Sequence, residues 1–259
     1  MVFVEHRGAG KGSSADVSRM EARWDLEWQD AGAADAVASL AQSENWERIH
    51  SLFPSGSRIL EAGCGYARWV RFLANEGHDA YGVDFSPVAI RVSLRDWPSL
   101  IGKVLQADLR RLPFADGFFD GIVSFGAIEH DIDGPDAALS EMRRVLRPGG
   151  AMYCTVPCFN GLRRIGLLAL QDWIVCNRTI RRLTGRRPEF SFFEYVWSRA
   201  EYEQIMRRHG FEIVDMVPLM PPAHWMGKQG TVRWRLVEWL HRRRPWLMPH
   251  MMAAVCRRP

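Results

Sequence analysis

Residues 58–67, Arg-Ile-Leu-Glu-Ala-Gly-Cys-Gly-Tyr-Ala, form the stretch that decides the fold of this chain. A short apolar run ends there in two glycines, Gly63 and Gly65, and a segment with a helical pattern follows at 67–76. Glycines between a strand and a helix let the backbone turn tightly and let a ligand approach the main chain. A plain strand-to-helix turn would contain the same residues, so the neighbouring sequence has to separate the two interpretations.

The alternation of strands and helices continues along the chain. Ser86 and Pro87 open a helix as N-cap and first helical residue, and a helix at 135–146 is followed by Pro148 and two glycines that stop it. Further strands are expected at 80–84, 104–108, 119–125 and 151–156, and after a break in the alternation at 211–217 and 251–256. Strands alternating with helices predict a parallel sheet with right-handed crossovers.

Two aspartates end successive strands of this predicted sheet. Asp84 lies about 20 residues after the glycine turn, where a carboxylate can accept hydrogen bonds from ribose hydroxyls. Asp108 ends the next strand. Either residue alone could cap a helix or lie in a solvated loop. Because the glycine turn and both aspartates lie at the ends of neighbouring strands, we expect them to converge on one ligand-binding crevice.

Together these segments resemble the class I S-adenosylmethionine (SAM)-dependent methyltransferases, and most of all the small-molecule and ubiquinone-biosynthesis type. The residues that carry the resemblance are 59–67, 83–86, 107–109 and 141–150. The resemblance implies an α/β fold, a Rossmann-like doubly wound sheet of seven strands in the order 3-2-1-4-5-7-6 with the last strand antiparallel. A dinucleotide is the other ligand to consider, but Pro-Gly-Gly after the helix and the Gly-x-Gly-x-Ala pattern favour SAM over NAD.

The resemblance also implies which residues bind the cofactor: Glu61, Gly63, Cys64, Gly65, Asp84, Phe85, Asp108, Leu109 and Phe125. In the family the two glycines pass under the methionine and ribose parts of SAM, and the residue corresponding to Glu61 helps to orient the amino group. Asp84 would hold the ribose hydroxyls. Asp108 would receive the adenine amino group, with Leu109 and Phe85 against the ring. Ala67 stands where many members have a third glycine.

His130 follows the fourth strand, where the family places the methyl group. A hydroxyl acceptor has to lose its proton, and histidine titrates near neutral pH, so His130 is the candidate general base. A loop histidine that packs over the cofactor is the alternative. Glu129 and His130 match two members of a metal-binding triplet of some quinone O-methyltransferases. Gly126 and Ala127 occupy the place of the preceding acidic member, so we expect no metal.

The predicted substrate pocket contains Glu129, Phe193 and Tyr195. The expected reaction is methyl transfer to a small aromatic or lipophilic acceptor, with O-methylation favoured over N or C. A membrane-surface methyltransferase of a quinone or lipid-linked substrate, a nucleic-acid methyltransferase and a non-catalytic SAM-binding protein are the alternatives. Residues 124–127 lack the Asn/Asp-Pro-Pro-aromatic motif of enzymes that methylate nucleobase amino groups, so no nucleic-acid partner is expected.

The chain is expected to divide into five parts. These are a disordered tail at 1–18, N-terminal helices at 19–57 that include one at 35–52, the SAM-binding core at 58–157, a helical, basic lid at 158–198, and a C-terminal part at 199–259 with a helical insert at 218–249. No signal peptide or spanning apolar run is evident, and the five cysteines have no C-x-x-C spacing. A cytoplasmic protein with reduced thiols is therefore expected.

Charge is unevenly distributed along the chain. Residues 151–259 carry 18 Lys and Arg against 8 Asp and Glu. Apolar segments with tryptophan and flanking arginines at 161–183 and 232–246 suit a membrane interface. A lid or a homodimer face is the simpler interpretation of these segments, and RNA binding is a third. Peripheral membrane association thus remains open beside a cytoplasmic location.

Overall fold

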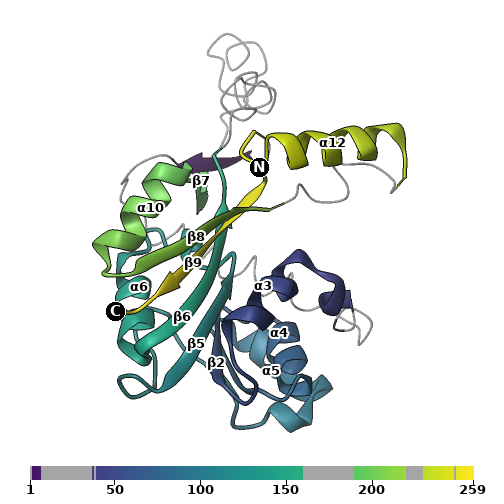
Figure 1. The fold of residues 1–259 in the computed structure, drawn as a ribbon. Coiled ribbons are helices and arrows are strands. Elements are labelled where there is room, and N and C mark those ends of the chain that lie inside the picture. The colour runs from purple at the N-terminus through teal and green to yellow at the C-terminus, as the bar shows by residue number, and fades with distance from the viewer. Residues whose placement is uncertain (1, 7–36, 38, 160–189, 220–229, 248) are drawn as a thin grey trace, which may run out of the picture.

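The computed structural model describes residues 2–6, 37, 39–159, 190–219, 230–247 and 249–259, and its centre is an open seven-stranded sheet (Figure 1). The sheet has the order β4-β3-β2-β5-β6-β9-β8. Its strands are β2 (Arg58–Ala62), β3 (Asp79–Asp84), β4 (Val104–Gln106), β5 (Phe119–Phe125), β6 (Leu146–Pro157), β8 (Glu212–Pro218) and β9 (Met251–Arg257). Numbered along the chain within the sheet, this is the predicted order 3-2-1-4-5-7-6. The neighbours from β4 to β6 pair in parallel, and the last strand β9 is antiparallel to both of its neighbours, which confirms the prediction.

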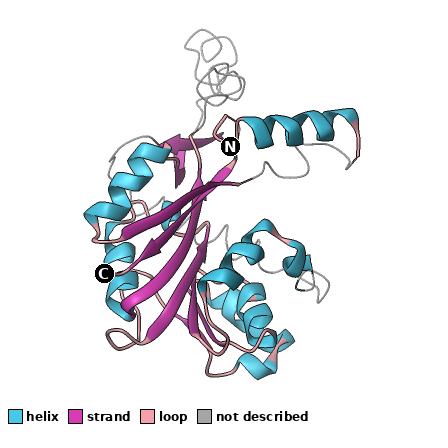
Figure 2. Cartoon of the chain, viewed as in Figure 1, coloured by secondary structure: helices cyan, strands magenta, loops and turns pink. Residues whose placement is uncertain are grey.

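Helices cover both faces of the sheet (Figure 2). One face carries α3 (Glu44–Leu52), α4 (Arg68–Asn75) and α5 (Pro87–Asp96), and the other carries α6 (Asp136–Val145) and α10 (Arg199–Arg208). Short 3-10 turns occur at η1 (Ser39–Gln42), η2 (Pro98–Leu100) and η3 (Ile128–His130). Each face has its own apolar core, with Leu73 and Tyr153 in one and Leu139 and Tyr202 in the other, all fully buried. A doubly wound sheet buries both faces in this way.

The predicted helix starts have their expected caps. The Ser86 hydroxyl accepts a hydrogen bond of 3.1 Å from the Ala89 amide, and Pro87 is the first helical residue of α5. The helix expected at 35–52 is interrupted, which corrects that prediction. Ser43 is the N-cap of α3 and accepts from the Trp46 amide at 3.2 Å, so the chain restarts its helix there after η1.

The first residues of the chain form a strand, which corrects the expectation of a disordered tail over this part of 1–18. β1 (Val2–His6) pairs in parallel with β7 (Phe190–Tyr195), a strand at the end of the segment expected to form a helical lid. The β-branched and aromatic residues of Val-Phe-Val favour extended backbone once a partner strand is available. Residues 7–18, the first part of the expected N-terminal helices and most of the lid, 160–189, lie outside the described residues.

α12 (Val232–Arg243) lies within the insert at 218–249 that we expected to be helical, and it extends away from the sheet (Figure 1). Its N-cap is Thr231, whose hydroxyl accepts from the Trp234 amide at 3.3 Å. Within the described ranges, no helix combines the length and apolar character needed to cross a membrane. The four described cysteines are buried free thiols, and Cys176 lies outside the described residues.

Candidate active site

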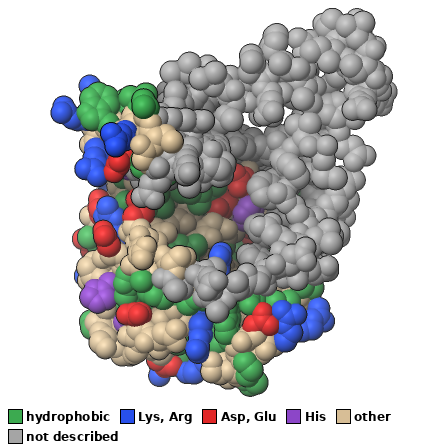
Figure 3. Space-filling model, turned by 90° about the vertical axis from the view of Figure 1, so that its right-hand side faces the viewer, with side chains coloured by type: hydrophobic (Ala, Val, Ile, Leu, Met, Phe, Trp, Pro, Cys, Tyr) green, Lys and Arg blue, Asp and Glu red, His purple; other side chains and the backbone are tan. Residues whose placement is uncertain are grey.

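The loops that follow β2, β3 and β5 meet at one edge of the sheet and enclose a cavity of about 340 Å³, called here the cofactor cavity. Figure 3 looks onto a hollowed face of the molecule in which acidic and histidine side chains gather. Nine predicted site residues line this cavity: Glu61, Gly63, Cys64, Gly65, Asp84, Phe85, Leu109, Phe125 and His130. The sheet topology brings them together because parallel strands present their carboxyl ends at the same edge.

The glycine turn packs tightly against the loop after β5. Gly63 has φ +78°, and a Cβ at this position would lie 2.4 Å from the Cβ of Ala127. The amides of Gly63 and Cys64 both donate to the Val83 carbonyl at 2.9 Å. A side chain at Gly63 would therefore be strained by the backbone and would also collide with Ala127.

Asp84 is held against the glycine turn. Its Oδ2 accepts a hydrogen bond of 2.8 Å from the Gly65 amide, and its Oδ1 accepts one of 2.9 Å from the Ser86 amide. The side chain is buried and lines the cofactor cavity. A carboxylate has about four acceptor positions, so this type of side chain can hold backbone amides and a ligand hydroxyl together.

Glu61 is a buried acid on the floor of the cofactor cavity. Its Oε2 accepts a hydrogen bond of 3.0 Å from the Val70 amide in the first turn of α4. Burial raises the pKa of Glu61 well above its ordinary range, and the Val70 hydrogen bond and the charge of Arg68 oppose that rise.

Ala67, just before α4, adopts a left-handed conformation with φ +55°, which is the backbone conformation that a third glycine would adopt easily.

Asp108 lines a smaller adjoining cavity of about 140 Å³ instead of the larger one. Phe85, Leu109 and His130 line both cavities. The Arg110 guanidinium contacts the carboxylate of Asp108 through Nε at 3.0 Å and Nη2 at 2.6 Å, and these hydrogen bonds lower the pKa of Asp108. Sequence reasoning did not anticipate this ion pair, although Arg110 is only two residues away.

Trp69 is a cavity residue that sequence reasoning missed. Its ring stacks on Phe125 with centroids 4.6 Å apart and an interplanar angle of 16°. Both rings line the cofactor cavity and together form an aromatic wall of it. The available signal was its position in the first turn of α4, directly after the glycine turn.

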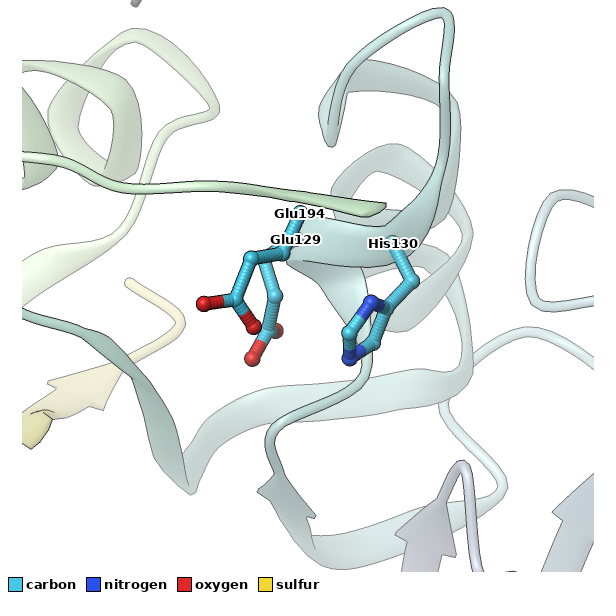
Figure 4. A group of neighbouring side chains, drawn as sticks. All are labelled: Glu129, His130 and Glu194. Atoms are coloured by element: carbon cyan, nitrogen blue, oxygen red, sulfur yellow. The ribbon is translucent and has the colours of Figure 1, made fainter. Parts of the chain in front are cut away.

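The residues predicted to line the substrate pocket lie in different places. Glu129 and His130 lie on η3, and Glu194 on β7 approaches them (Figure 4). One ligand atom from each of the three side chains lies within 4.8 Å of the others. Tyr195 is buried elsewhere, since its hydroxyl donates to the Ile132 carbonyl at 2.8 Å and it lines neither described cavity. The Phe193 side chain lies outside the described part of the structure.

Comparisons with known proteins agree with this geometry. Residues 60–154 match the family model described as "Methyltransferase domain". A demethylmenaquinone methyltransferase of Renibacterium salmoninarum is 33% identical over 45% of this chain and 49% of its own, so the chain spans about half the length of that relative. A malonyl-[acyl-carrier protein] O-methyltransferase of Pectobacterium atrosepticum is 32% identical over 82% of this chain and 77% of its own.

Solved structures share the fold. Geranyl diphosphate C-methyltransferase from Streptomyces coelicolor, solved with S-adenosylhomocysteine, superposes with a TM-score of 0.60 at 16% identity, over 96% of this chain and 100% of its own. With the sheet order, the cavity around Gly65 and Asp84, and the match over most of a methyltransferase relative, these similarities identify the family. The chain belongs to the class I SAM-dependent methyltransferases.

Proposed function

We propose that this protein transfers a methyl group from SAM to a small aromatic or lipophilic acceptor. The observation that supports this most is the cofactor cavity itself, which is lined by the glycine turn, the Asp84 carboxylate and the stacked rings of Trp69 and Phe125. The polar side suits the ribose and amino acid ends of SAM. The aromatic side suits its sulfonium cation, since a cation is attracted to the face of an aromatic ring.

His130 supports transfer to an oxygen. It lines both cavities, and Trp69 and Phe125 line the larger one with it. Methyl transfer from a sulfonium needs an acceptor held in line with the methyl group, and a hydroxyl acceptor also needs a base. Histidine has the appropriate intrinsic basicity near neutral pH. Two relatives are a demethylmenaquinone methyltransferase and a malonyl-[acyl-carrier protein] O-methyltransferase, and their substrates favour a quinone-like or lipid-related acceptor.

The exposed face of α12 supports contact with a membrane that holds such an acceptor. Val232, Leu236 and Trp239 lie four and three residues apart, on one side of the helix, and are 84%, 54% and 53% exposed. Arg242 and Arg243 follow in the last turn. An exposed apolar stripe next to arginines is typical of helices that lie in an anionic membrane interface. The other expected contact, 161–183, lies outside the described residues.

The proposed activity is tested with SAM labelled on the methyl group. Purified protein is incubated with labelled SAM and either demethylmenaquinol, a simple catechol or malonylated acyl carrier protein, and the labelled product is separated from SAM. Label on an oxygen atom of one acceptor, absent when His130 is replaced by alanine, supports O-methylation with His130 as base. Label on carbon, or unchanged turnover in His130→Ala, contradicts that assignment. SAM binding without label in any acceptor favours a SAM-binding protein without transferase activity.

A further inference from the structure

Three potential metal ligands from two distant parts of the chain meet beside the cofactor cavity. Glu129 and His130 come from η3, and Glu194 comes from β7 (Figure 4). Their ligand atoms, two carboxylate oxygens and an imidazole nitrogen, all lie within 4.8 Å of one another. Ligands around a six-coordinate cation with bonds of about 2.1 Å are roughly 3.0 to 4.2 Å apart, so a small closure of this group would complete a site.

The Glu129 side chain is the strongest evidence that something binds there. It is only 1% exposed, and its Oε2 has no hydrogen-bond partner among the described residues. Burying a carboxylate without a partner is costly, and buried acids are normally paired or coordinate metals. A second carboxylate, from Glu194, lies close to it.

We propose that Glu129, His130 and Glu194 bind a divalent transition-metal cation. Two carboxylates and one imidazole are a donor set that suits Mn²⁺, Fe²⁺ or Zn²⁺ better than the all-oxygen sites preferred by Mg²⁺ and Ca²⁺. The cation compensates both carboxylates and gives the unpartnered Oε2 of Glu129 a partner. From the sequence we expected no metal, because Gly126 and Ala127 stand where an acidic ligand would precede Glu129. The structure supplies the third ligand from β7 instead.

Three protein ligands leave coordination positions for other molecules, which is the usual arrangement of catalytic metal sites. His130 lines both cavities, so those positions adjoin the place of the acceptor. A cation there would hold an acceptor oxygen and favour its deprotonated form, and it would replace His130 as the group that promotes deprotonation, because a metal-bound imidazole nitrogen cannot also accept the proton. This role rests on the proposed methyl transfer, whereas metal binding itself rests on the three side chains alone.

Mn²⁺ is the probe of choice, because its electron paramagnetic resonance signal separates bound from free ion. Wild-type protein is titrated with Mn²⁺, and the modulation of the electron spin echo by ¹⁴N is recorded. One bound Mn²⁺ per chain, displaced by Zn²⁺ and showing imidazole nitrogen modulation, is the expected result. No tightly bound Mn²⁺ or Zn²⁺ in folded wild-type protein overturns the proposal, and this requires no variant.

The variants Glu129→Gln and Glu194→Gln test whether these two side chains bind the cation. Loss of a direct ligand should weaken Mn²⁺ binding at least about tenfold in each, whereas Glu212→Gln, the same change at an exposed position of β8, should leave it unaltered. Equal affinity in wild type and both ligand variants would overturn the assignment. Titration of the same samples with S-adenosylhomocysteine separates the metal site from the proposed methyl transfer. A variant that no longer binds Mn²⁺ but still binds S-adenosylhomocysteine has lost the metal site alone. Wild-type protein that binds Mn²⁺ but transfers no methyl group would contradict only the proposed function.

Discussion

The backbone amide of Gly65 donates a hydrogen bond of 2.8 Å to Oδ2 of Asp84, and this contact joins the glycine turn to the end of the neighbouring strand. The second oxygen of the same carboxylate accepts from the Ser86 amide at 2.9 Å. The Asp84 side chain therefore has both a structural place in the loops and a place in the cofactor cavity. It fixes the loop after β2 against the loop after β3, and it lines the cofactor cavity.

Replacing Gly63 by alanine should disrupt this turn. The new Cβ would lie 2.4 Å from the Cβ of Ala127, in a backbone that already has φ +78°. Overpacking of this kind costs about 1–3 kcal/mol in the free energy of unfolding, measured by urea denaturation. Gly56→Ala is the matched control, because Gly56 has φ +80° but open space around it, so it reports the backbone strain alone. A Gly63→Ala variant no less stable than Gly56→Ala would show that the contact with Ala127 is not restrictive.

The buried acid Glu61 should make stability depend on pH. Because its pKa is raised in the folded protein, the folded state binds the proton more tightly than the unfolded state. The stabilisation by the protonated form is complete below the ordinary pKa near 4.5 and is lost as the pH rises through the raised value. Glu61→Gln still offers Val70 an acceptor but carries no charge. Its free energy of unfolding should therefore fall less than that of wild type between about pH 5 and pH 8. Parallel pH profiles would argue against a raised pKa.

Arg144 should be irreplaceable by lysine. Its guanidinium donates to the Leu112 carbonyl at 3.0 Å, to the Phe114 carbonyl at 2.8 Å and to both carboxylate oxygens of Glu141 at 2.8 Å. A lysine ammonium cannot reach this set of acceptors in one geometry. Arg144→Lys is expected to lower the free energy of unfolding by about 1.5–3 kcal/mol, as hydrogen bonds to charged groups are lost. A loss below about 0.5 kcal/mol, the range of ordinary surface substitutions, would contradict this structural role.

The exposed face of α12 should carry membrane binding. Wild-type protein is expected to sediment with vesicles containing phosphatidylglycerol and to remain in the supernatant with phosphatidylcholine alone, since arginines flank the apolar stripe. Trp239→Ser should reduce the bound fraction several-fold. Glu238→Ser, next to it in the sequence, is the control and should not reduce binding. Sedimentation unaffected by Trp239→Ser, or equal with both lipids, would contradict the proposed contact.

The core of the fold was predictable because its signals are local. The apolar run before Gly63, the cap at Ser86 and the alternation of strands and helices each depend on neighbouring residues, and together they give the sheet order that the structure shows. The same holds for Asp84, whose place at a strand end follows from its spacing after the glycine turn.

The features that escaped prediction depend on contacts between distant segments. β1 and β7 are separated by more than half of the chain, and neither has a partner that the sequence pattern reveals. Glu194 reaches Glu129 only because β7 passes beside η3. The missed break at Ser43 has another cause, because the helical pattern on both sides of it masked a serine that caps α3.

The most direct test of the central claim is calorimetric titration of the purified protein with S-adenosylhomocysteine, repeated with Asp84→Ala and with Asp215→Ala, an exposed aspartate of β8, as control. Charge-assisted hydrogen bonds to the ribose are worth about 1.5–3 kcal/mol, so Asp84→Ala should weaken binding roughly 10- to 100-fold while the control binds as wild type does. Thermal unfolding of each sample confirms that it is folded. Folded wild-type protein that binds neither S-adenosylhomocysteine nor SAM, or an Asp84→Ala variant with undiminished affinity, would contradict the assignment of the cofactor cavity.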